Sequence, residues 1–523
     1  MKRVFAFLIL LVAAPDSAAL RHRPRFLGRF AGSGLRNIAG DSNHAAQYQT
    51  RYFRQRLDHF SFADEPSFNQ RYLVGPVGRL WAPPAPIFFY CGNEGDIEWF
   101  SDNTGFVWEI AHRFSSLVIF AEHRYYGESM PFGSKEKAYK DAKSLAYLTT
   151  EQALADFVTL LTDFKRNMSA EDSPVILFGG SYGGSKILAL QFAHAYINNV
   201  IGLFFKAKLL TSLTRLKYPH IAIGALASSA PILQFEDLVP PNSFYDIASN
   251  DFKRESLNCF NVIKKSWNVL EDRGKHRHGL IGLSRKFRLC KDLIDTEQLS
   301  NWLDSAYSYL AMVDYPYASN FLMPLPAHPI KEVCKKVDGY PDGADILDRI
   351  FAGASIYYNY TGTVDCFDLE DDPHGMSGWD WQACTEMVMP LSSSKDSSMF
   401  PPSSFDFSAL ADFCIQKYDV RPRPRWVTTE FGGHDISTVL KKFGSNIIFS
   451  NGLLDPWSGG GVLQNISHSI IALVTKLGAH HIDLRSSTKD DPRWLSDLRD
   501  AELKLIKSWL NEYYLEKKSS YCI

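Results

Sequence analysis

The chain has 523 residues, which is too long for one simple core, so we expect one large domain with a major insertion or two to three domains. Apolar residues make up 45% and charged residues 22%, as is typical of a globular protein. The formal net charge of −2 gives no reason to expect nucleic acid or an anionic membrane as a partner. Composition therefore indicates an ordinary globular protein, and its 71 aromatic residues (36 Phe, 24 Tyr and 11 Trp) would suit a deep apolar pocket.

The N-terminus is typical of an export signal. Lys2 and Arg3 supply positive charge, residues 4–14 are apolar, and small residues follow, so we predict a signal peptide over residues 1–19. The apolar run is too short for a stable membrane anchor, and a buried N-terminal helix is the alternative. Residues 20–50 are Arg-rich and then rich in small residues, which predicts a flexible leader or propeptide.

Two further features agree with export. No other segment approaches 18 consecutive apolar residues, so we expect no membrane anchor in the mature chain. Three sequons predict glycosylation at Asn167, Asn359 and Asn465. We therefore expect a location in the secretory pathway, either extracellular or in a lysosome or vacuole.

Strand and helix patterns alternate over residues 51–234. Residues 52–60 and 68–72 predict a first pair of strands, and apolar runs predict further strands at 87–90, 117–121, 175–178 and 221–230. Residues 104–114 and 150–166 have helical spacing between them. This alternation predicts an α/β fold, with a largely parallel sheet covered by helices on both faces.

The strand at 175–178 leads directly into Gly179-Gly-Ser-Tyr-Gly183, which fits the pattern G-x-S-x-G. In an α/β-hydrolase this pattern is a sharp strand-to-helix turn that exposes a nucleophilic serine, here Ser181. Glycines are needed there because the turn leaves no room for side chains beside the serine. A plain turn is the alternative, but the preceding strand favours the nucleophile.

From about residue 235 to 430 strand patterns become scarce and helical stretches such as 255–271 and 296–312 alternate with turns. Six of the eight cysteines fall in this region, with Cys91 and Cys522 apart from them. We predict a mainly helical, disulfide-stapled cap over residues 235–430, inserted into an α/β-hydrolase domain that resumes over 431–516. No C-x-x-C pair occurs, which argues against a zinc ribbon, and we expect no metal and no cofactor.

A serine nucleophile needs a histidine base and a carboxylate that orients it. In this fold the order along the chain is serine, acid, histidine. Asp455 follows the strand predicted at 446–450 and His480 follows the next one at 470–474, before the closing helix predicted at 498–516. We therefore predict a triad of Ser181, Asp455 and His480, although taken alone Asp455 could be a turn-capping residue and His480 a loop histidine.

An oxyanion hole should combine the N–H of Tyr182 with one from an earlier strand-to-helix loop. The glycine-rich loop after the strand at 87–90 is the candidate, with Gly92 and Asn93 as its donors. A plain tight turn is the alternative interpretation.

These motifs resemble the S28 serine peptidases, over about residues 50–515. The resemblance rests on Gln55-Arg-Leu-Asp-His-Phe60, Gly92-Asn-Glu-Gly-Asp96, His123-Arg-Tyr-Tyr-Gly-Glu-Ser129, Gly179-Gly-Ser-Tyr-Gly-Gly184, Met312-Val-Asp-Tyr-Pro-Tyr317, Ala383-Cys-Thr-Glu386, Asn451-Gly-Leu-Leu-Asp-Pro-Trp457 and Gly478-Ala-His-His481. It is closest to the branch of Pro-X carboxypeptidases, through residues 313–321 and 421–424.

The resemblance implies an exopeptidase that cuts next to proline, with proline-containing peptides as substrates and acidic compartments as its usual setting. It implies that Met389 and Trp457 line an apolar slot for the proline ring. It also implies three disulfides, Cys259–Cys334, Cys290–Cys366 and Cys384–Cys414, which leaves Cys91 and Cys522 without an inherited partner. A homodimer is compatible with the resemblance.

One segment departs from the family pattern. Residues 185–214 replace the usual short helix, so that the motif Arg215-Leu-Lys-Tyr-Pro219 arrives about two dozen residues late. A gene-model or splicing error, a tolerated loop and an altered, inactive enzyme are three explanations. Residues 186–196 still favour a helix, so the serine turn can survive the change.

Four functions remain open at this point. The first is a Pro-X carboxypeptidase, and the second is a peptidase that removes dipeptides from the N-terminus. The third is an esterase or lipase on the same scaffold. The fourth is a catalytically impaired hydrolase fold used for binding, which residues 185–214 favour and the complete set of Ser181, Asp455 and His480 disfavours.

Overall fold

The structure is a computed structural model that describes residues 48–63, 66–76, 81–191, 218, 220–370 and 377–520. The predicted signal peptide, the predicted leader except its last three residues, and Cys522 lie outside these ranges. In the described part, strands and helices alternate before residue 229 and again after residue 446, as the sequence predicted.

Eight strands form one sheet in the described residues, in the order β1-β2-β4-β3-β5-β6-β7-β8. The pairs β1–β2 and β2–β4 are antiparallel and all other neighbours are parallel. The strands are β1 Gln49–Arg56, β2 Ser67–Gly75, β3 Ile87–Cys91, β4 Leu117–Ala121, β5 Val175–Gly180, β6 Gly224–Ser228, β7 Ile447–Gly452 and β8 Ile470–Thr475. The parallel strands β3 to β8 therefore direct their carboxyl ends to one edge, where chemistry is found in such sheets.

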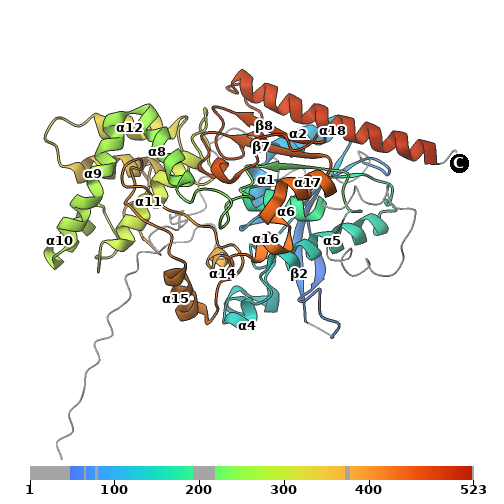
Figure 1. Cartoon of the computed structure of the whole chain (residues 1–523), viewed down its shortest axis with the longest axis horizontal. Helices are drawn as coiled ribbons and strands as arrows, with labels where there is room; N and C mark the ends of the chain where they lie inside the picture. The colour runs from blue at the N-terminus through green and yellow to red at the C-terminus, as the bar shows by residue number, and fades with distance from the viewer. Residues whose placement is uncertain are drawn as a thin grey trace, which may run out of the picture.

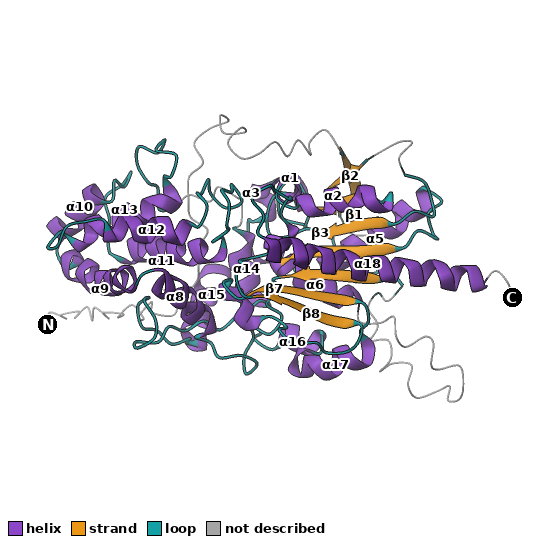
Figure 2. Ribbon diagram, turned by 90° about the horizontal axis from the view of Figure 1, so that it is seen from above, coloured by secondary structure: helices purple, strands orange, loops and turns teal. Residues whose placement is uncertain are grey.

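Helices cover both faces of this sheet. Successive side chains of a strand point to opposite faces, and accordingly Phe89 packs with Phe157 of α5, whereas Phe88 packs in the cluster that contains Trp509 of α18. Figure 2 shows α18 lying over the sheet. The helices of this part are α1 Ile97–Asp102, α2 Gly105–Phe114, α3 Lys135–Ala138, α4 Ala142–Leu145, α5 Thr150–Asn167, α6 Ser181–Gln191, α16 Trp426–Glu430, α17 Ile436–Phe443 and α18 Arg493–Ser520.

The described chain between β6 and α16 forms helices and loops, with no strand longer than an isolated bridge. These helices are α8 Ser243–Glu255, α9 Leu257–Gly274, α10 Arg277–Lys286, α11 Glu297–Met312, α12 Pro329–Asp338, α13 Ile346–Tyr358, α14 Gly378–Thr385 and α15 Phe407–Tyr418. Helices α8 to α12 gather at one end of the molecule, away from the sheet (Figure 1). The chain therefore has an α/β-hydrolase fold with an inserted helical cap.

The three disulfides implied by the family resemblance are confirmed, and all three lie in the cap: Cys259–Cys334, Cys290–Cys366 and Cys384–Cys414. Cys91 is free and buried in β3.

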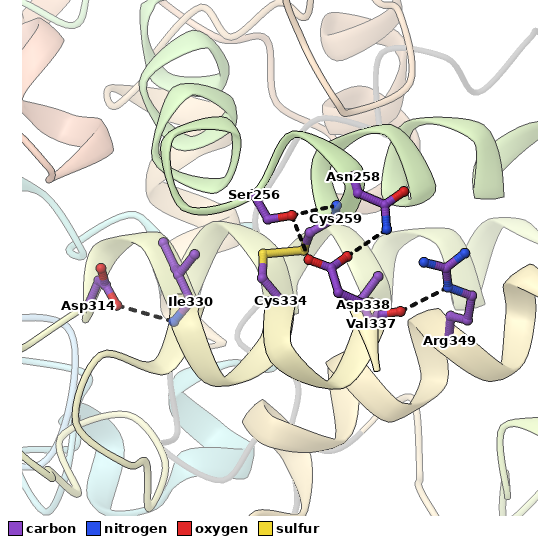
Figure 3. Close-up of a disulfide and its surroundings, with 9 residues drawn as sticks. All are labelled: Ser256, Asn258, Cys259, Asp314, Ile330, Cys334, Val337, Asp338 and Arg349. Atoms are coloured by element: carbon purple, nitrogen blue, oxygen red, sulfur yellow. Dashed lines mark hydrogen bonds between the residues drawn. A yellow bond between two sulfur atoms is a disulfide. The ribbon is translucent and has the colours of Figure 1, made fainter. Parts of the chain in front are cut away.

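The Cys259–Cys334 bridge joins α9 to α12, and Figure 3 shows that hydrogen bonds also link these two helices. Ser256 accepts from the N–H of Cys259 at 3.1 Å and donates to Asp338 at 2.6 Å, so one N-cap residue ties both helices together. Asn258 adds a second bond to Asp338, at 2.8 Å.

Several helices differ from the sequence expectation, and two of them show why. The helix predicted at 255–271 corresponds to α9, which begins only after Ser256, and a separate helix, α8, precedes it. Ser256 is extended (φ −156°, ψ 119°), so it ends α8 and caps α9. The six-residue helix α1 was not expected, because it is too short to show a helical period and forms on its N-cap, Asp96.

No helix within the described ranges has the length and apolar character that crossing a bilayer would require.

Candidate active site

Ser181 stands at the end of β5 and opens α6, with a backbone φ of +51°. This left-handed conformation is unfavourable for residues other than glycine, and it turns the chain sharply between strand and helix. The neighbouring glycines have no room for side chains. A Cβ on Gly179 would lie 2.6 Å from the carbonyl carbon of Gly183, and one on Gly183 would lie 2.4 Å from Asn93. The motif thus has the crowded geometry of a nucleophile elbow.

Asp455 and His480 form a hydrogen-bonded pair, with 2.7 Å between Oδ2 of the carboxylate and Nδ1 of the imidazole. Asp455 follows β7 and is fully buried, and its other oxygen accepts from the N–H of Trp457 at 3.0 Å. The carboxylate is therefore fixed from one side by the backbone and orients the imidazole on the other. This is the arrangement in which Nε2 of a histidine serves as a base.

The loop that carries His480 is held from the cap and from the sheet. The N–H of His480 donates to the carbonyl of Met312 at the end of α11 (2.8 Å), and its carbonyl accepts from the hydroxyl of Tyr315 (2.7 Å). The N–H of His481 donates to Oγ of Ser229, just after β6, at 2.9 Å. Both the peptide before and the peptide after His480 are thus fixed.

The His480 loop and the serine turn are in contact. A Cβ built on Gly180, the residue before Ser181, would lie 3.1 Å from the ring of His481. The rings of His480 and His481 are themselves 4.3 Å apart between centroids. Burial, aided by the charges of His480 and Arg485, lowers the pKa of His481 well below its usual value, so His481 adds a neutral ring beside the turn.

The predicted oxyanion donors have different surroundings. The N–H of Gly92 donates to the carbonyl of Ala121 at 3.0 Å and so is already engaged; the prediction that Gly92 serves as a donor is corrected here. Gly92 is instead required for close packing, because a Cβ would lie 2.2 Å from that same carbonyl oxygen. The side chain of Asn93 donates to the carbonyl of Gly180 at 2.7 Å, which joins this loop directly to the serine turn.

Ser181 opens into a cavity of about 100 Å³. Both residues predicted to form the proline slot, Met389 and Trp457, line this cavity with it. The lining is otherwise mostly apolar and comes from the sheet domain and the cap alike: Glu94, Tyr182, Ser185, Pro231, Tyr309, Met312, Trp379, Ala383, Met387, Val388, Leu391, Phe405 and Leu410. Such a lining suits a compact apolar side chain next to the serine.

A buried polar cluster lies behind Tyr182. The ammonium of Lys186 sits 3.9 Å from the centre of the Tyr182 ring and donates to the carbonyl of Gly92 at 3.0 Å. Burial lowers the pKa of Lys186 to about 7. The Tyr182 hydroxyl contacts Gln382 and Thr150, and Thr150 donates in turn to Glu386, whose pKa burial raises to about 7.

Sequence reasoning missed Lys186, Glu94 and Glu386 as parts of this site. Two of them had a signal, because Glu94 and Glu386 stand in motifs that carry the family resemblance. Lys186 had none, since it belongs to the segment that departs from the family. That segment is described only as far as Gln191, within α6; residues 192–214 lie outside the described ranges.

The predicted glycosylation sites lie away from this cavity. Asn167 ends α5 and is exposed, as is Asn465 before β8. Asn359 follows α13, is partly buried, and makes two hydrogen bonds with the backbone of Val364. Glycosylation at the three positions stays a prediction.

The family described as serine carboxypeptidase S28 matches residues 55–203 and 200–502, in two pieces that meet inside the segment that departs from the family. The chain is 44% identical over 479 residues to the lysosomal Pro-X carboxypeptidase of Homo sapiens, covering 90% of each chain. It is 42% identical over 523 residues to that of Pongo abelii, covering 98% of each.

A solved structure, that of the acetyl esterase MekB, is 13% identical, with a TM-score of 0.39 over 87% of this chain and 97% of that one. A likeness this weak adds nothing to the assignment. The S28 family model matches most of the chain. The alignments with the two carboxypeptidases cover 90% or more of this chain and of each relative. The chain belongs to the S28 family of serine carboxypeptidases.

Proposed function

We propose that the chain is a Pro-X carboxypeptidase, which hydrolyses the peptide bond between a proline and the C-terminal residue. Family membership makes it a serine-type peptidase. The finer assignment to this specificity is supported by relatives named lysosomal Pro-X carboxypeptidase at 42% and 44% identity. The same relatives support a location in the secretory pathway or lysosome, and a homodimer stays a prediction for light scattering to test.

In the proposed reaction, Oγ of Ser181 attacks the carbonyl carbon of the proline residue while Nε2 of His480 accepts the hydroxyl proton. The C–N bond of the resulting tetrahedral intermediate breaks, and His480 returns the proton to the leaving amine. Water then enters by the same path, releases the acid and regenerates Ser181. Asp455 stabilises the imidazolium in each half-reaction.

Two further roles belong to this proposal. The main-chain N–H groups of Tyr182 and Asn93 stabilise the oxyanion, since the side chain of Asn93 anchors its loop to the serine turn at 2.7 Å. Met389 and Trp457 hold the proline ring, since both line the cavity that Ser181 enters. No cofactor takes part in the proposed reaction.

The observation that carries the proposal is the 2.7 Å hydrogen bond between Asp455 and His480, in a loop that packs against the turn of Ser181. It is tested with a peptide that has proline second from each end. Mass spectrometry should find loss of the C-terminal residue only, with the wild type but not with Ser181→Ala. Loss of an N-terminal dipeptide would instead identify a dipeptidyl peptidase.

Labelling with a fluorophosphonate separates the peptidase from an esterase and from a binding protein. An esterase or lipase would be labelled at Ser181 and would leave both ends of the peptide intact. A catalytically impaired binding protein, the case that the segment 185–214 favours, would show no Ser181-dependent label at all. Either outcome would contradict the proposed function.

A further inference from the structure

Glu94 is the one charged residue among the described residues that line the Ser181 cavity. It follows β3 and is partly exposed, but its Oε2 is enclosed and accepts no hydrogen bond from the described residues. No described lysine, arginine or histidine lies within ion-pair distance of its carboxylate. An enclosed carboxyl oxygen without a partner beside a reactive serine calls for a ligand group, because leaving such an atom unpaired is costly.

The titratable and charged groups that face Glu94 come from several elements. Lys186 of α6 and His480 act on it with positive charge, and the phenols of Tyr90, Tyr126 and Tyr182 surround it. Burial raises the pKa of Glu94, and the opposing effects of its own backbone N–H and of the charges of Lys186 and His480 are smaller. The carboxyl thus tends to keep its proton at acid pH and to lose it as pH rises.

We propose that Glu94 is a substrate-binding residue that, as a neutral carboxylic acid, donates a hydrogen bond to the C-terminal carboxylate of the peptide. This inference rests on the proposed function and adds to it the group that recognises the end of the substrate. The other lining residues are apolar, aromatic or hydroxylic, so the cavity offers a carboxylate no arginine, lysine or histidine from the described residues. A protonated carboxyl is then the strongest donor that the lining can present.

The protonation state of Glu94 decides which end of a peptide is accepted. In its neutral form it pairs with a carboxylate, and in its ionised form it repels a carboxylate and would attract an N-terminal ammonium instead. Binding of a free C-terminus should therefore weaken as pH rises, whereas binding of an amidated C-terminus should not. A carboxamide can accept from the neutral acid and donate to the ionised one, so it has a partner in both states.

The test uses two N-blocked Pro-Phe peptides, one with a free C-terminal carboxylate and one with a carboxamide. For the wild type, KM of the free acid should rise at least tenfold from the acidic to the alkaline end of the pH range in which the enzyme is active, and KM of the amide should stay within twofold over the same range. Glu94→Gln should abolish the rise for the free acid, because the amide donates at every pH. Glu94→Asp should retain the rise, because it still titrates.

The inference is overturned if the free acid and the amide have parallel KM profiles in the wild type, or if Glu94→Gln has the wild-type profile. A third peptide, with a free N-terminus and proline as its second residue, completes the test. The inference is also overturned if the wild type removes the N-terminal dipeptide from this third peptide and Glu94→Gln loses that activity, since Glu94 would then bind an amine. Fluorophosphonate labelling of Ser181 checks that each variant keeps an intact site, and the wild-type comparison stands even if a variant does not fold. Failure of the proposed function looks different: the wild type would cleave neither Pro-Phe peptide at any pH.

Discussion

Asp304 is a buried carboxyl of the cap whose ionisation should weaken the fold. It lies in α11 and is 6% exposed, and its Oδ1 accepts from the hydroxyl of Tyr245 at 3.2 Å and from that of Ser308 at 3.3 Å. Burial raises its pKa from 3.8 to about 7, against the smaller opposing effect of these two hydroxyls. The perturbation is Asp304→Asn, which keeps the acceptor oxygen and the size of the side chain but cannot ionise.

The direction in which the free energy of unfolding changes with pH follows from the number of protons that the folded and unfolded states bind. Below pH 3.8 Asp304 is protonated in both states; between that value and about 7 the folded state holds one proton more than the unfolded state. The free energy of unfolding therefore falls as pH rises, by up to about 1.4 kcal/mol per pH unit from this residue. Between pH 4.5 and 6.5 that amounts to at most about 3 kcal/mol.

Unfolding by guanidinium, followed by tryptophan fluorescence at several pH values, measures this effect. The free energy of unfolding of the wild type should decrease from pH 4.5 to 6.5. The decrease for Asp304→Asn should be smaller than that of the wild type by about 1–3 kcal/mol. Asp497→Asn is the matched control: its side chain is 68% exposed and pairs only loosely with Arg493, at 3.7 Å, so the slope should stay that of the wild type. Equal slopes for wild type and Asp304→Asn would refute the reasoning.

Two further predictions concern the triad and the packing. Asp455→Asn should lower kcat for peptide hydrolysis by roughly 10³–10⁴, because an amide no longer fixes the tautomer of His480; steady-state kinetics measure this, and a loss below tenfold would contradict the assigned role. Gly224→Ala should destabilise the fold by about 1–3 kcal/mol, because its Cβ would lie 2.2 Å from the ring of Trp509. Gly282→Ala, in α10 with nothing within 4 Å, should instead stabilise it by about 0.5–1 kcal/mol. Thermal unfolding compares the two, and an equal effect would count against the packing argument.

Much of the sheet was predictable because the parallel strands β3 to β7 are buried on both faces and therefore appear as continuous apolar runs. The strand predicted at 117–121 is β4, residue for residue, and the elbow strand needed only its glycines added. The helix that was missed, α1, and the start of α9 depend on single capping residues, Asp96 and Ser256, and a cap is a weak signal without an apolar period beside it.

The active site was predictable only in part, because position along the chain identifies its catalytic residues but not the contacts of the residues around them. Ser181, Asp455 and His480 each follow an apolar run, so strand-end position and chain order identify them. The engaged N–H of Gly92 and the unpartnered oxygen of Glu94 depend on contacts between residues far apart in sequence. No local pattern encodes such contacts, so the sequence could indicate the loop but not which of its atoms remain available.

The backbone bonds that the cap makes to His480 have a consequence for protein engineering. Met312 and Tyr315 hold the peptide units on either side of the base, yet both belong to the inserted region rather than to the sheet domain. A chimaera with a foreign cap would have to carry residues 312–315 along with it, because a cap lacking them would remove both hydrogen bonds to the main chain of His480.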